Sequence, residues 1–336
     1  MISPERLDTD RLMPGVTLAA RGAGVARAGT PRRGVSPARR AQYVAAYTLM
    51  SPALLLFTVA FVIPIGYSVW LSVLGRRSGG GGAYSAREEG FVGLGNYVDV
   101  LADATFWASL LRLAVFSVLL VPLMMVTSIL LALLLDLPRA KFASFSRMAI
   151  FLPYGVPSVI AALMWGFLYV PEISPVHQLT SGLGLALPNL LTGDWVYVAL
   201  VNVVLWGNVG FNTVIIYTSL RSLPREQIDA ARIDGCGEAR IARYVKLPHV
   251  VPATVLTGLF AMIGALQIYS EPTMLATLAN GLHSTFFPLM RVYRDAFAHD
   301  DLNTAAAASI LLALATVVLS LLVLAGRQLA TRRAVR

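Results

Sequence analysis

Long apolar runs alternate with shorter polar stretches along the chain from about residue 43 onward. Six of these runs exceed the roughly 18 apolar residues that a membrane-crossing helix needs. They are Tyr43–Leu74, Trp107–Leu135, Met148–Val170, Trp195–Leu220, Val251–Ala276 and Thr304–Ala325. The first run is longer than a perpendicular span requires, which predicts a tilt or an interfacial extension. The pattern therefore predicts an all-α integral membrane protein with six transmembrane helices.

Composition agrees with this prediction and excludes an ordinary soluble domain. Hydrophobic residues make up 57% of the 336 residues and charged residues only 13%, with a mean hydropathy of +0.68. Prolines within the apolar runs predict kinks, which bundles of membrane helices tolerate. These prolines are Pro52, Pro64, Pro122, Pro153 and Pro157.

The two ends of the chain differ from the apolar body, which covers residues 43–326. Residues 1–42 are rich in Arg, Pro, Gly and Ala without apolar periodicity, and we expect them to be a disordered basic tail. This tail is too long and too charged for a signal peptide. It could bind anionic lipid or be inert. Residues 327–336 form a second, short basic tail.

The distribution of basic residues predicts the orientation in the membrane. With the N-terminus inside and six spans, 21 of the 27 Lys and Arg residues fall on the inner side and five on the outer side. The remaining one, Arg112, lies within a span, where we expect it to snorkel toward the outer interface. This excess predicts a multi-pass bacterial plasma-membrane protein with both termini in the cytoplasm. It also explains the net charge of +9 without nucleic acid, which we do not expect as a partner.

The polar stretch between the fourth and fifth runs, residues 221–250, has a helical rather than a loop composition. Pro224 suits a first helical turn, and Glu226 and Asp229 follow near the positive end of that helix. Small residues come next, and Asp234–Gly237 breaks the helix. We expect a second short basic helix from Glu238 to Lys246 that ends at Pro248, with Pro252 opening the next apolar run.

This stretch, called the coupling loop below, suggests a docking element. Small residues allow another surface to approach the backbone, and glycines set the angle between two short helices. Its charges can pair with a soluble partner at the membrane face. The alternative from composition alone is an amphipathic hairpin that lies on the lipid headgroups.

The coupling loop resembles the EAA loop of membrane subunits of ABC importers. The family pattern is EAA, two residues, DGA, a spacer and a final LP. The chain has Asp229-Ala230-Ala231, then Asp234-Gly235-Cys236, then Lys246-Leu247-Pro248 at the matching distance. Asp229 keeps the charge of the usual Glu, and Cys236 is a small residue in place of Ala. The family's aromatic residue would fall at Ala242, so that contact is weaker or displaced here.

Other segments resemble the sugar-importing, maltose-transporter membrane-subunit type, over residues 43 to about 325. They are Phe91–Tyr97, Trp165, Trp206–Asn212, Tyr293, Phe297 and Asn303–Ala308. One departure is Ala279–Leu282, where the family has Gly-Gly-Pro, so the loop there could contact its partner differently. The insertion Gly79–Gly82 is expected to be a flexible surface linker.

The resemblance implies an assembly in which this chain carries no chemistry of its own. Its implied partners are a dimer of ATP-binding subunits, a second permease subunit in a heterodimer, an extracytoplasmic binding protein and membrane lipid. We expect Glu226, Asp229 to Ala231, Asp234 to Cys236 and Pro248 to couple the chain to the ATPase. ATP and Mg would be used by that ATPase, and no cofactor is expected on this chain.

The sequence lacks the motifs of an enzyme. It has no GxxxxGK[ST] phosphate loop and no HExxH or CxxC motif, and its four histidines lie in loops or at span ends. Cys236 is the only cysteine, so the chain cannot form an internal disulfide. We therefore expect neither a catalytic nor a metal site.

Polar side chains within the spans predict where a substrate passes. Gln267, Tyr269, Ser270 and Glu271 cluster in the fifth run, where the family's sugar-contacting residues fall, although Glu271 could gate the outer end instead. The fourth run adds Asn202, Trp206, Asn208 and Asn212, of which the last two share one helical face. Amides, hydroxyls and aromatic rings suit a polyol. Each of these polar residues could instead join helices together.

Together these features predict the membrane subunit of a binding-protein-dependent ABC importer for a carbohydrate or related polyol, glycerol phosphate esters included. A secondary transporter for a small polar solute is the alternative from composition. Such carriers often use intramembrane carboxylates or inverted repeats. Here only Asp136 and Glu271 approach the spans, both near span ends, and no repeat is evident.

Overall fold

The computed structural model describes residues 37–78, 87–137, 142–184 and 188–334, and the chain divides into two compact units, Met1–Val59 and Ala60–Arg336. In the first unit, helix α1 (Pro37–Phe57) is followed by the start of a π-helical turn, η1 (Thr58–Val62). The helix begins inside the predicted disordered tail, because Pro is favoured at a first helical position and Ala, Arg and Gln are good helix formers. The rest of that tail lies outside the described residues.

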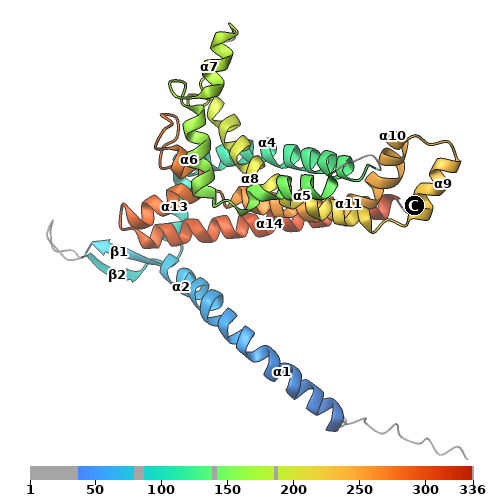
Figure 1. Cartoon of the computed structure of the whole chain (residues 1–336). Coiled ribbons are helices and arrows are strands. Elements are labelled where there is room, and N and C mark those ends of the chain that lie inside the picture. The colour runs from blue at the N-terminus through green and yellow to red at the C-terminus, as the bar shows by residue number, and fades with distance from the viewer. Residues whose placement is uncertain (1–36, 79–86, 138–141, 185–187, 335–336) are drawn as a thin grey trace, which may run out of the picture. The chain divides into compact units, whose positions relative to one another are not determined.

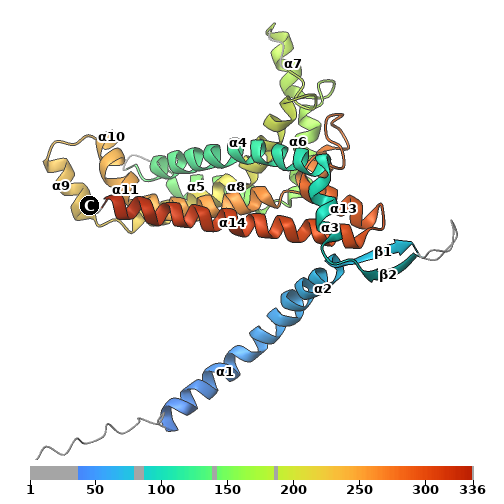
Figure 2. The same cartoon turned by 180° about the vertical axis from the view of Figure 1, so that it is seen from behind.

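The second unit is a bundle of long helices that lie side by side (Figures 1 and 2). They are α4 (Ala104–Leu135), α8 (Trp195–Arg221), α11 (Leu247–Leu266) and α14 (Leu302–Ala334), with α2 (Ile63–Ser72) packed on α14. The core between α4 and α8 is apolar and fully buried, with Phe116, Leu120 and Met124 facing Leu200 and Val203. α14 runs through most of the predicted basic tail 327–336.

Five helices of the described chain are long and apolar enough to cross a membrane, or six if one bent pair counts as a single span. The five are Gln42–Ser72, Ala104–Leu135, Trp195–Arg221, Glu238–Leu266 and Leu302–Gly326. The prediction of an all-α membrane protein is confirmed. The third and fifth spans, however, differ in form from the continuous helices that were predicted.

The third apolar run is two helices rather than one. α5 (Ala143–Phe151) passes through a 3₁₀ turn, η2 (Leu152–Gly155), and α6 (Ser158–Tyr169) leaves at an angle of 98°. Pro153 and Pro157 cause the break, because each lacks a backbone donor and disfavours helical geometry in the residue before it. The prolines predicted a kink, and in the structure the chain changes direction by 98°.

The fifth span begins earlier and ends earlier than predicted. α10 (Glu238–Ile241), a π-helical segment η3 (Ala242–Lys246) and α11 form one continuous helix, so the predicted helix end at Pro248 is wrong. Pro248 lies in the first turn of α11, immediately after the wider π turn, where its missing donor is tolerated. At the other end, α11 stops at Leu266 and a short helix α12 (Ser270–Leu275) follows after a break.

The two ends of the bundle carry different structures. At one end, here called the loop end, lie α9 (Arg225–Ile233), α10 and the last turns of α14 (Figures 1 and 2). The opposite hairpin end holds strands β1 (Leu74–Ser78) and β2 (Arg87–Phe91), which pair antiparallel with Leu74 opposite Phe91. It also holds α3 (Gly95–Ala102), α7 (Pro175–Gly182) and α13 (Pro288–Phe297), and none of these five elements was predicted. The predicted Gly79–Gly82 linker lies outside the described residues.

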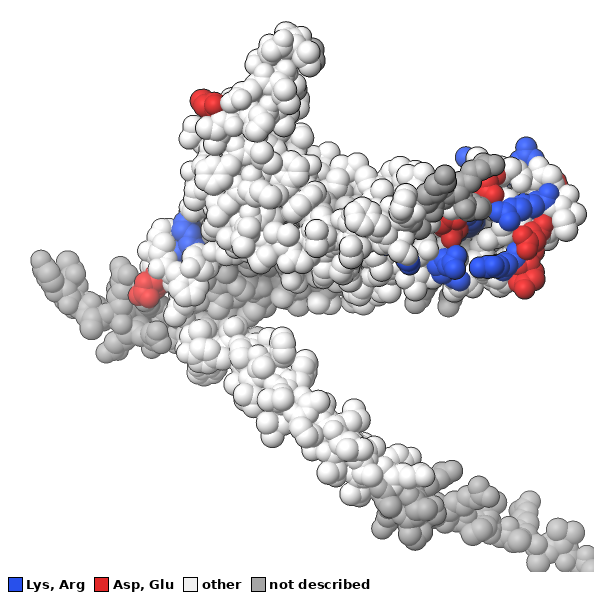
Figure 3. Space-filling model, in the orientation of Figure 1, with Lys and Arg blue, Asp and Glu red and all other residues white. Residues whose placement is uncertain are grey.

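Charged side chains avoid the middle of the bundle. In Figure 3, Lys, Arg, Asp and Glu gather over α9 and α10 at the loop end, while the surface of the long helices is free of described charge on the face shown. Many large apolar side chains of α4 and α14 are exposed on that surface, among them Val118, Leu130, Val317 and Leu322. An uncharged band of this kind suits the hydrocarbon core of a bilayer.

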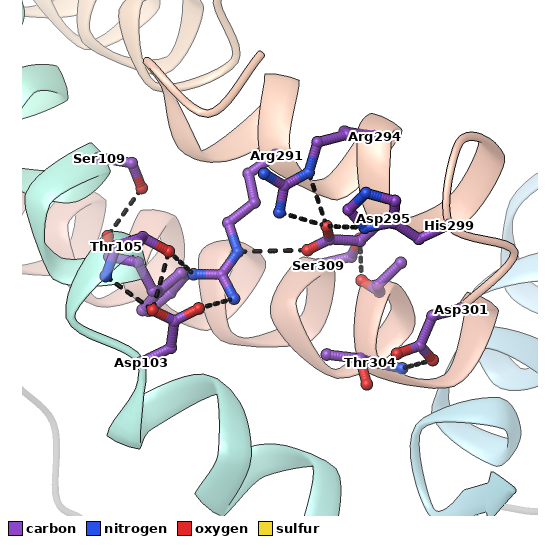
Figure 4. A network of polar contacts seen from close by, with 12 residues as sticks. Asp103, Thr105, Ser109, Arg291, Arg294, Asp295, His299, Asp301, Thr304 and Ser309 are labelled. Carbon is purple, nitrogen blue, oxygen red and sulfur yellow. Dashed lines mark hydrogen bonds and ion pairs between the residues drawn. The ribbon is translucent and has the colours of Figure 1, made fainter. Parts of the chain in front are cut away.

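A buried ionic network fixes the hairpin end (Figure 4). Arg291 of α13 contacts Asp103, the N-cap of α4, at 2.6 Å and Asp295 at 3.2 Å, and it donates to the Thr105 hydroxyl at 3.2 Å. Arg294 also contacts Asp295 at 2.6 Å. Since Arg291 and Asp295 are buried in the contact between α13 and its neighbours, the network ties α13 to the start of α4.

Candidate functional site

A cavity of about 410 Å³ lies where the fifth span breaks, between α4, α8, α11 and the α5–α6 turn. Six of the seven predicted pathway residues line it: Asn208, Asn212, Gln267, Tyr269, Ser270 and Glu271. The structure thus brings together two groups that are more than fifty residues apart in sequence. Their role in transport remains a prediction.

The break in the fifth span gives the cavity its polar wall. Gln267 caps the end of α11, and Tyr269 has an extended φ of −144° that cannot continue the helix. The Tyr269 carbonyl accepts a hydrogen bond of 2.6 Å from the Thr273 hydroxyl, which holds the start of α12. Backbone irregularity of this kind is tolerated at membrane depth where it lines a cavity.

The two asparagines of α8 form the opposite wall. Asn208 donates to the Val204 carbonyl at 2.9 Å, and Asn212 donates to the Asn208 carbonyl at 3.0 Å. Asn212 is 3% exposed, and its Oδ1 atom has no hydrogen-bond partner. A buried acceptor without a partner is costly, so the Oδ1 atom of Asn212 is a candidate to accept a hydrogen bond within the cavity.

Three further residues of the cavity were missed in the sequence. Tyr154 and Phe211 stack with ring centroids 4.9 Å apart and an interplanar angle of 15°, and Ser158 lies beside them. Pro153 and Pro157 flank Tyr154 and Ser158 at the break between η2 and α6, so the helix-breaking prolines were the available signal. Stacked rings offer a flat apolar face beside the amides.

Two polar residues predicted in the fourth span point elsewhere. Trp206 packs edge-on against Trp165 at 5.9 Å between centroids, and does not line the cavity. Asn202 donates to the Tyr169 hydroxyl at 2.6 Å, a contact between helices. Arg112 lies over the Phe286 ring at 5.3 Å, also outside the cavity.

The coupling loop forms a sharp turn at the loop end. Gly235 has a φ of +77°, and the backbone donors of Gly235 and Cys236 close the end of α9 on the carbonyls of Arg232 and Ala231. Arg232 bridges the turn, with contacts of 3.4 Å to Asp229 and 2.9 Å to Glu238. These contacts set the angle between α9 and α10.

The surface of the coupling loop is exposed. Five of the predicted coupling residues, Glu226, Asp229, Ala230, Asp234 and Gly235, are exposed, as is Pro248, while Ala231 and Cys236 are half-buried. Two large apolar side chains are exposed beside them, Ile233 at 87% and Tyr244 at 69%. Tyr244 lies two residues beyond Ala242, where the resemblance expects an aromatic ring. A charged surface with exposed apolar side chains is typical of a docking site.

The base of the coupling loop is fixed to the bundle. The Lys246 ammonium lies 2.7 Å from the Asp136 carboxylate, and both side chains are largely buried. His249 Nε2 lies 3.1 Å from the Ser219 carbonyl and 3.2 Å from the Ser222 hydroxyl at the end of α8. These contacts join the start of the fifth span to the ends of α4 and α8.

The described residues contain no group of three or more His, Cys, Asp or Glu side chains that could hold a metal ion. The segment Ala279–Leu282, which departs from the family pattern, packs into the chain through the buried Ala279 and Leu282, and Asn280 is exposed.

Comparison with known proteins adds a family. A family model described as "Binding-protein-dependent transport system inner membrane component" matches residues 124–336. The chain is 27% identical over 276 residues to the sn-glycerol-3-phosphate transport system permease protein UgpA of Yersinia enterocolitica, which covers 82% of this chain and 91% of the relative. It is also 27% identical over 328 residues to the diacetylchitobiose uptake system permease protein NgcF of Streptomyces coelicolor, with coverage of 94% and 90%.

A solved structure shares the fold. A chain from the crystal structure of a bacterial ABC transporter involved in the import of the acidic polysaccharide alginate superposes with a TM-score of 0.71 and 18% identity. The match covers 88% of this chain and 98% of that one.

Proposed function

The chain belongs to the family of binding-protein-dependent transport system inner membrane components, and we propose that it forms half of the path by which an ABC importer takes up a carbohydrate or related polyol. It is a multi-pass membrane protein and a permease subunit. The observation that carries the substrate class is the cavity at the broken fifth span, which combines amides and hydroxyls with the stacked rings of Tyr154 and Phe211.

The coupling loop is the docking site for a separate ATPase subunit. Its exposed charges, Ile233 and Tyr244 supply the surface, and the turn at Gly235 holds two short helices at a fixed angle. ATP and Mg are bound by that partner. The coupling loop of this chain acts as a rigid lever that transmits movement, and the chain supplies no catalytic group. The buried contacts of Lys246 and His249 carry the movement of the lever into α4, α8 and α11.

The orientation follows from this role. The loop end faces the cytoplasm, where ATP is available, and the C-terminal turns of α14 lie at the same end (Figure 1). The hairpin end then faces the binding protein. A second permease subunit, which we propose to be a different homologous chain, closes the other half of the path.

Substrates named for the relatives span neutral and anionic compounds, a diacetylated disaccharide and a phosphate ester. These names support a carbohydrate or polyol as the substrate class.

Purification of the full chain from native membranes tests the proposal. We expect an ATP-binding chain and a second permease to co-purify, and substrate uptake by the reconstituted complex to require ATP hydrolysis. Uptake that does not require ATP hydrolysis, or a chain that purifies without an ATP-binding partner, would contradict the proposal.

A further inference from the structure

We propose that the cavity selects its substrate by charge, and that it takes an uncharged or amino-bearing sugar or polyol while rejecting phosphate esters and uronates. This inference rests on the proposed function and narrows it, because phosphate esters were among the substrates left open there. Three features of the described residues support it. They are the charge that lines the cavity, the pairing of basic residues outside the cavity, and the hydrogen-bond acceptors of the lining.

Glu271 is the only charged side chain among the described residues that line the cavity. A second cavity of about 340 Å³ adjoins the first and shares Tyr154, Ser158, Asn208 and Glu271 with it. Among the described residues that line it, Glu271 is again the only charged one. A ligand that occupies either space therefore meets a carboxylate, and the described part of neither lining includes a lysine, arginine or histidine.

Four described basic residues of the bundle have partners outside the cavity lining. Arg112 lies over the Phe286 ring, and Arg291 and Arg294 contact Asp103 and Asp295 at the hairpin end. Lys246 is paired with Asp136 at the loop end. An anionic group in the cavity would thus be repelled by an ionised Glu271, and the described residues that line the cavity include no Lys, Arg or His to compensate.

Two acceptors of the cavity suit ligands that donate hydrogen bonds. Asn208 and Asn212 each use an amide donor on a backbone carbonyl, and the buried Oδ1 atom of Asn212 is an acceptor without a partner. The carboxylate of Glu271 adds acceptors. Sugar hydroxyls and ammonium groups supply donors to such a site, whereas ionised phosphate and carboxylate groups bring only acceptors.

Because the chain has a single cysteine, one thiol can be moved into the cavity and used to measure the charge there. Cys236→Ala places the family's usual residue in the coupling loop and leaves a chain without cysteine. Ser158→Cys then adds one nearly isosteric thiol that faces both cavities. In the purified complex with its partner chains, this thiol is modified with a cationic and an anionic methanethiosulfonate reagent of similar size, and each rate is normalised to a free thiol.

We expect the cationic reagent to react about tenfold faster or more, because the carboxylate attracts one reagent and repels the other. Glu271→Gln should bring the ratio close to one. Glu172→Gln is the matched control, since Glu172 is exposed in the segment between α6 and α7 and does not line either cavity. Equal normalised rates in the Glu271 chain, or a ratio that Glu271→Gln leaves unchanged, would overturn the inference.

A second measurement links this charge to substrate choice. Binding to the same complex is compared for three disaccharides of similar size: diacetylchitobiose, which is neutral, chitobiose, which carries amines, and a disaccharide of uronates. We expect the uronate to bind at least about tenfold more weakly, and Glu271→Gln to remove that difference. Equal binding of all three overturns charge selection alone, whereas binding of none contradicts the proposed substrate class as well.

Discussion

The hairpin end and the loop end of the bundle use charge in opposite ways. At the hairpin end, Arg291 and Asp295 are 4% and 6% exposed, and each has several partners within the chain (Figure 4). At the loop end, Arg232 bridges Asp229 and Glu238 on the surface, beside exposed Ile233 and Tyr244. The charges of the network at the hairpin end are therefore paired within the chain, while the loop end leaves its charges and apolar side chains exposed. Substitutions at the two ends should have different consequences.

The largest expected effect is at the hairpin end. Arg291→Leu leaves Asp103 and Asp295 without their shared partner, and breaking a buried ion pair costs about 3–5 kcal/mol. Thermal unfolding of the purified chain should therefore occur at a clearly lower temperature. Arg225→Leu, at an exposed position of α9, should change stability by less than about 0.5 kcal/mol. Similar unfolding of both variants would contradict the contrast between the two ends.

A close helix contact predicts the next effect. A Cβ atom at Gly210 of α8 would clash with the Ile150 carbonyl oxygen of α5, whereas one at Gly207 would meet nothing within 4 Å. Gly210→Ala should destabilise the chain by about 1–3 kcal/mol through overpacking, and Gly207→Ala should not. The unfolding temperatures of the two alanine variants test this directly. An unchanged Gly210→Ala protein would show that α5 is not held against α8.

The coupling loop predicts a smaller change in stability with a large change in function. Gly235→Ala forces an L-residue into the left-handed region at a cost of about 1–2 kcal/mol, although its Cβ meets nothing within 4 Å. Gly237→Ala is the matched control, because Gly237 has a φ of −73° and equally open surroundings. Transport per ATP hydrolysed should fall only for Gly235→Ala, and further for Gly235→Trp, with membrane insertion intact. Normal uptake by the Gly235→Trp chain would contradict the proposal that the rigid turn at Gly235 couples ATP hydrolysis to transport.

The smallest effect concerns pH at the hairpin end. Burial opposes ionisation of Asp103, but hydrogen bonds from Thr105 and the charge of Arg291 outweigh it and lower the pKa of this carboxyl below 3.8. Its stabilising contribution is thus fully present above the unfolded pKa and is lost as the pH falls through the lower folded value. Asp103→Asn should remove this part of the acid dependence from unfolding curves. Identical acid dependence of unfolding in the unsubstituted chain and in Asp103→Asn would contradict this stabilising role of the Asp103 carboxylate.

Much of the fold could be predicted because apolar runs of membrane length leave few alternatives. The fourth span was predicted within one residue of α8, and the polar clusters of the fourth and fifth runs do meet around one cavity. Trp206 was predicted together with them but packs on Trp165 and does not line the cavity, because helical spacing alone cannot separate a cavity face from a packing face. The 98° turn before α6 exceeded the predicted kink because two prolines act within five residues.

Other features depend on contacts that no local pattern reveals. Asn96 in the segment Phe91–Tyr97 donates to the carbonyls of Ser72 and Leu74, so this family segment fixes the start of the hairpin. The burial of Lys246 could not be foreseen either, since its partner Asp136 lies 110 residues earlier in the chain. Amphipathic α13 buries Arg291 and Asp295 and exposes Tyr293 and Phe297, the reverse of the usual pattern, because the ionic partners of Arg291 are Asp103 at the start of α4 and Asp295 of α13 itself.

The claim that the loop end docks an ATPase on the cytoplasmic face can be measured with Cys236, the only cysteine of the chain. A membrane-impermeant maleimide is applied to sealed right-side-out and inside-out vesicles, before and after peripheral chains are stripped from the inside-out ones. We predict labelling only in inside-out vesicles, with a rate that rises on stripping and falls again when the purified ATPase is restored. Labelling from the outside, or a rate unaffected by the ATPase, would contradict the account.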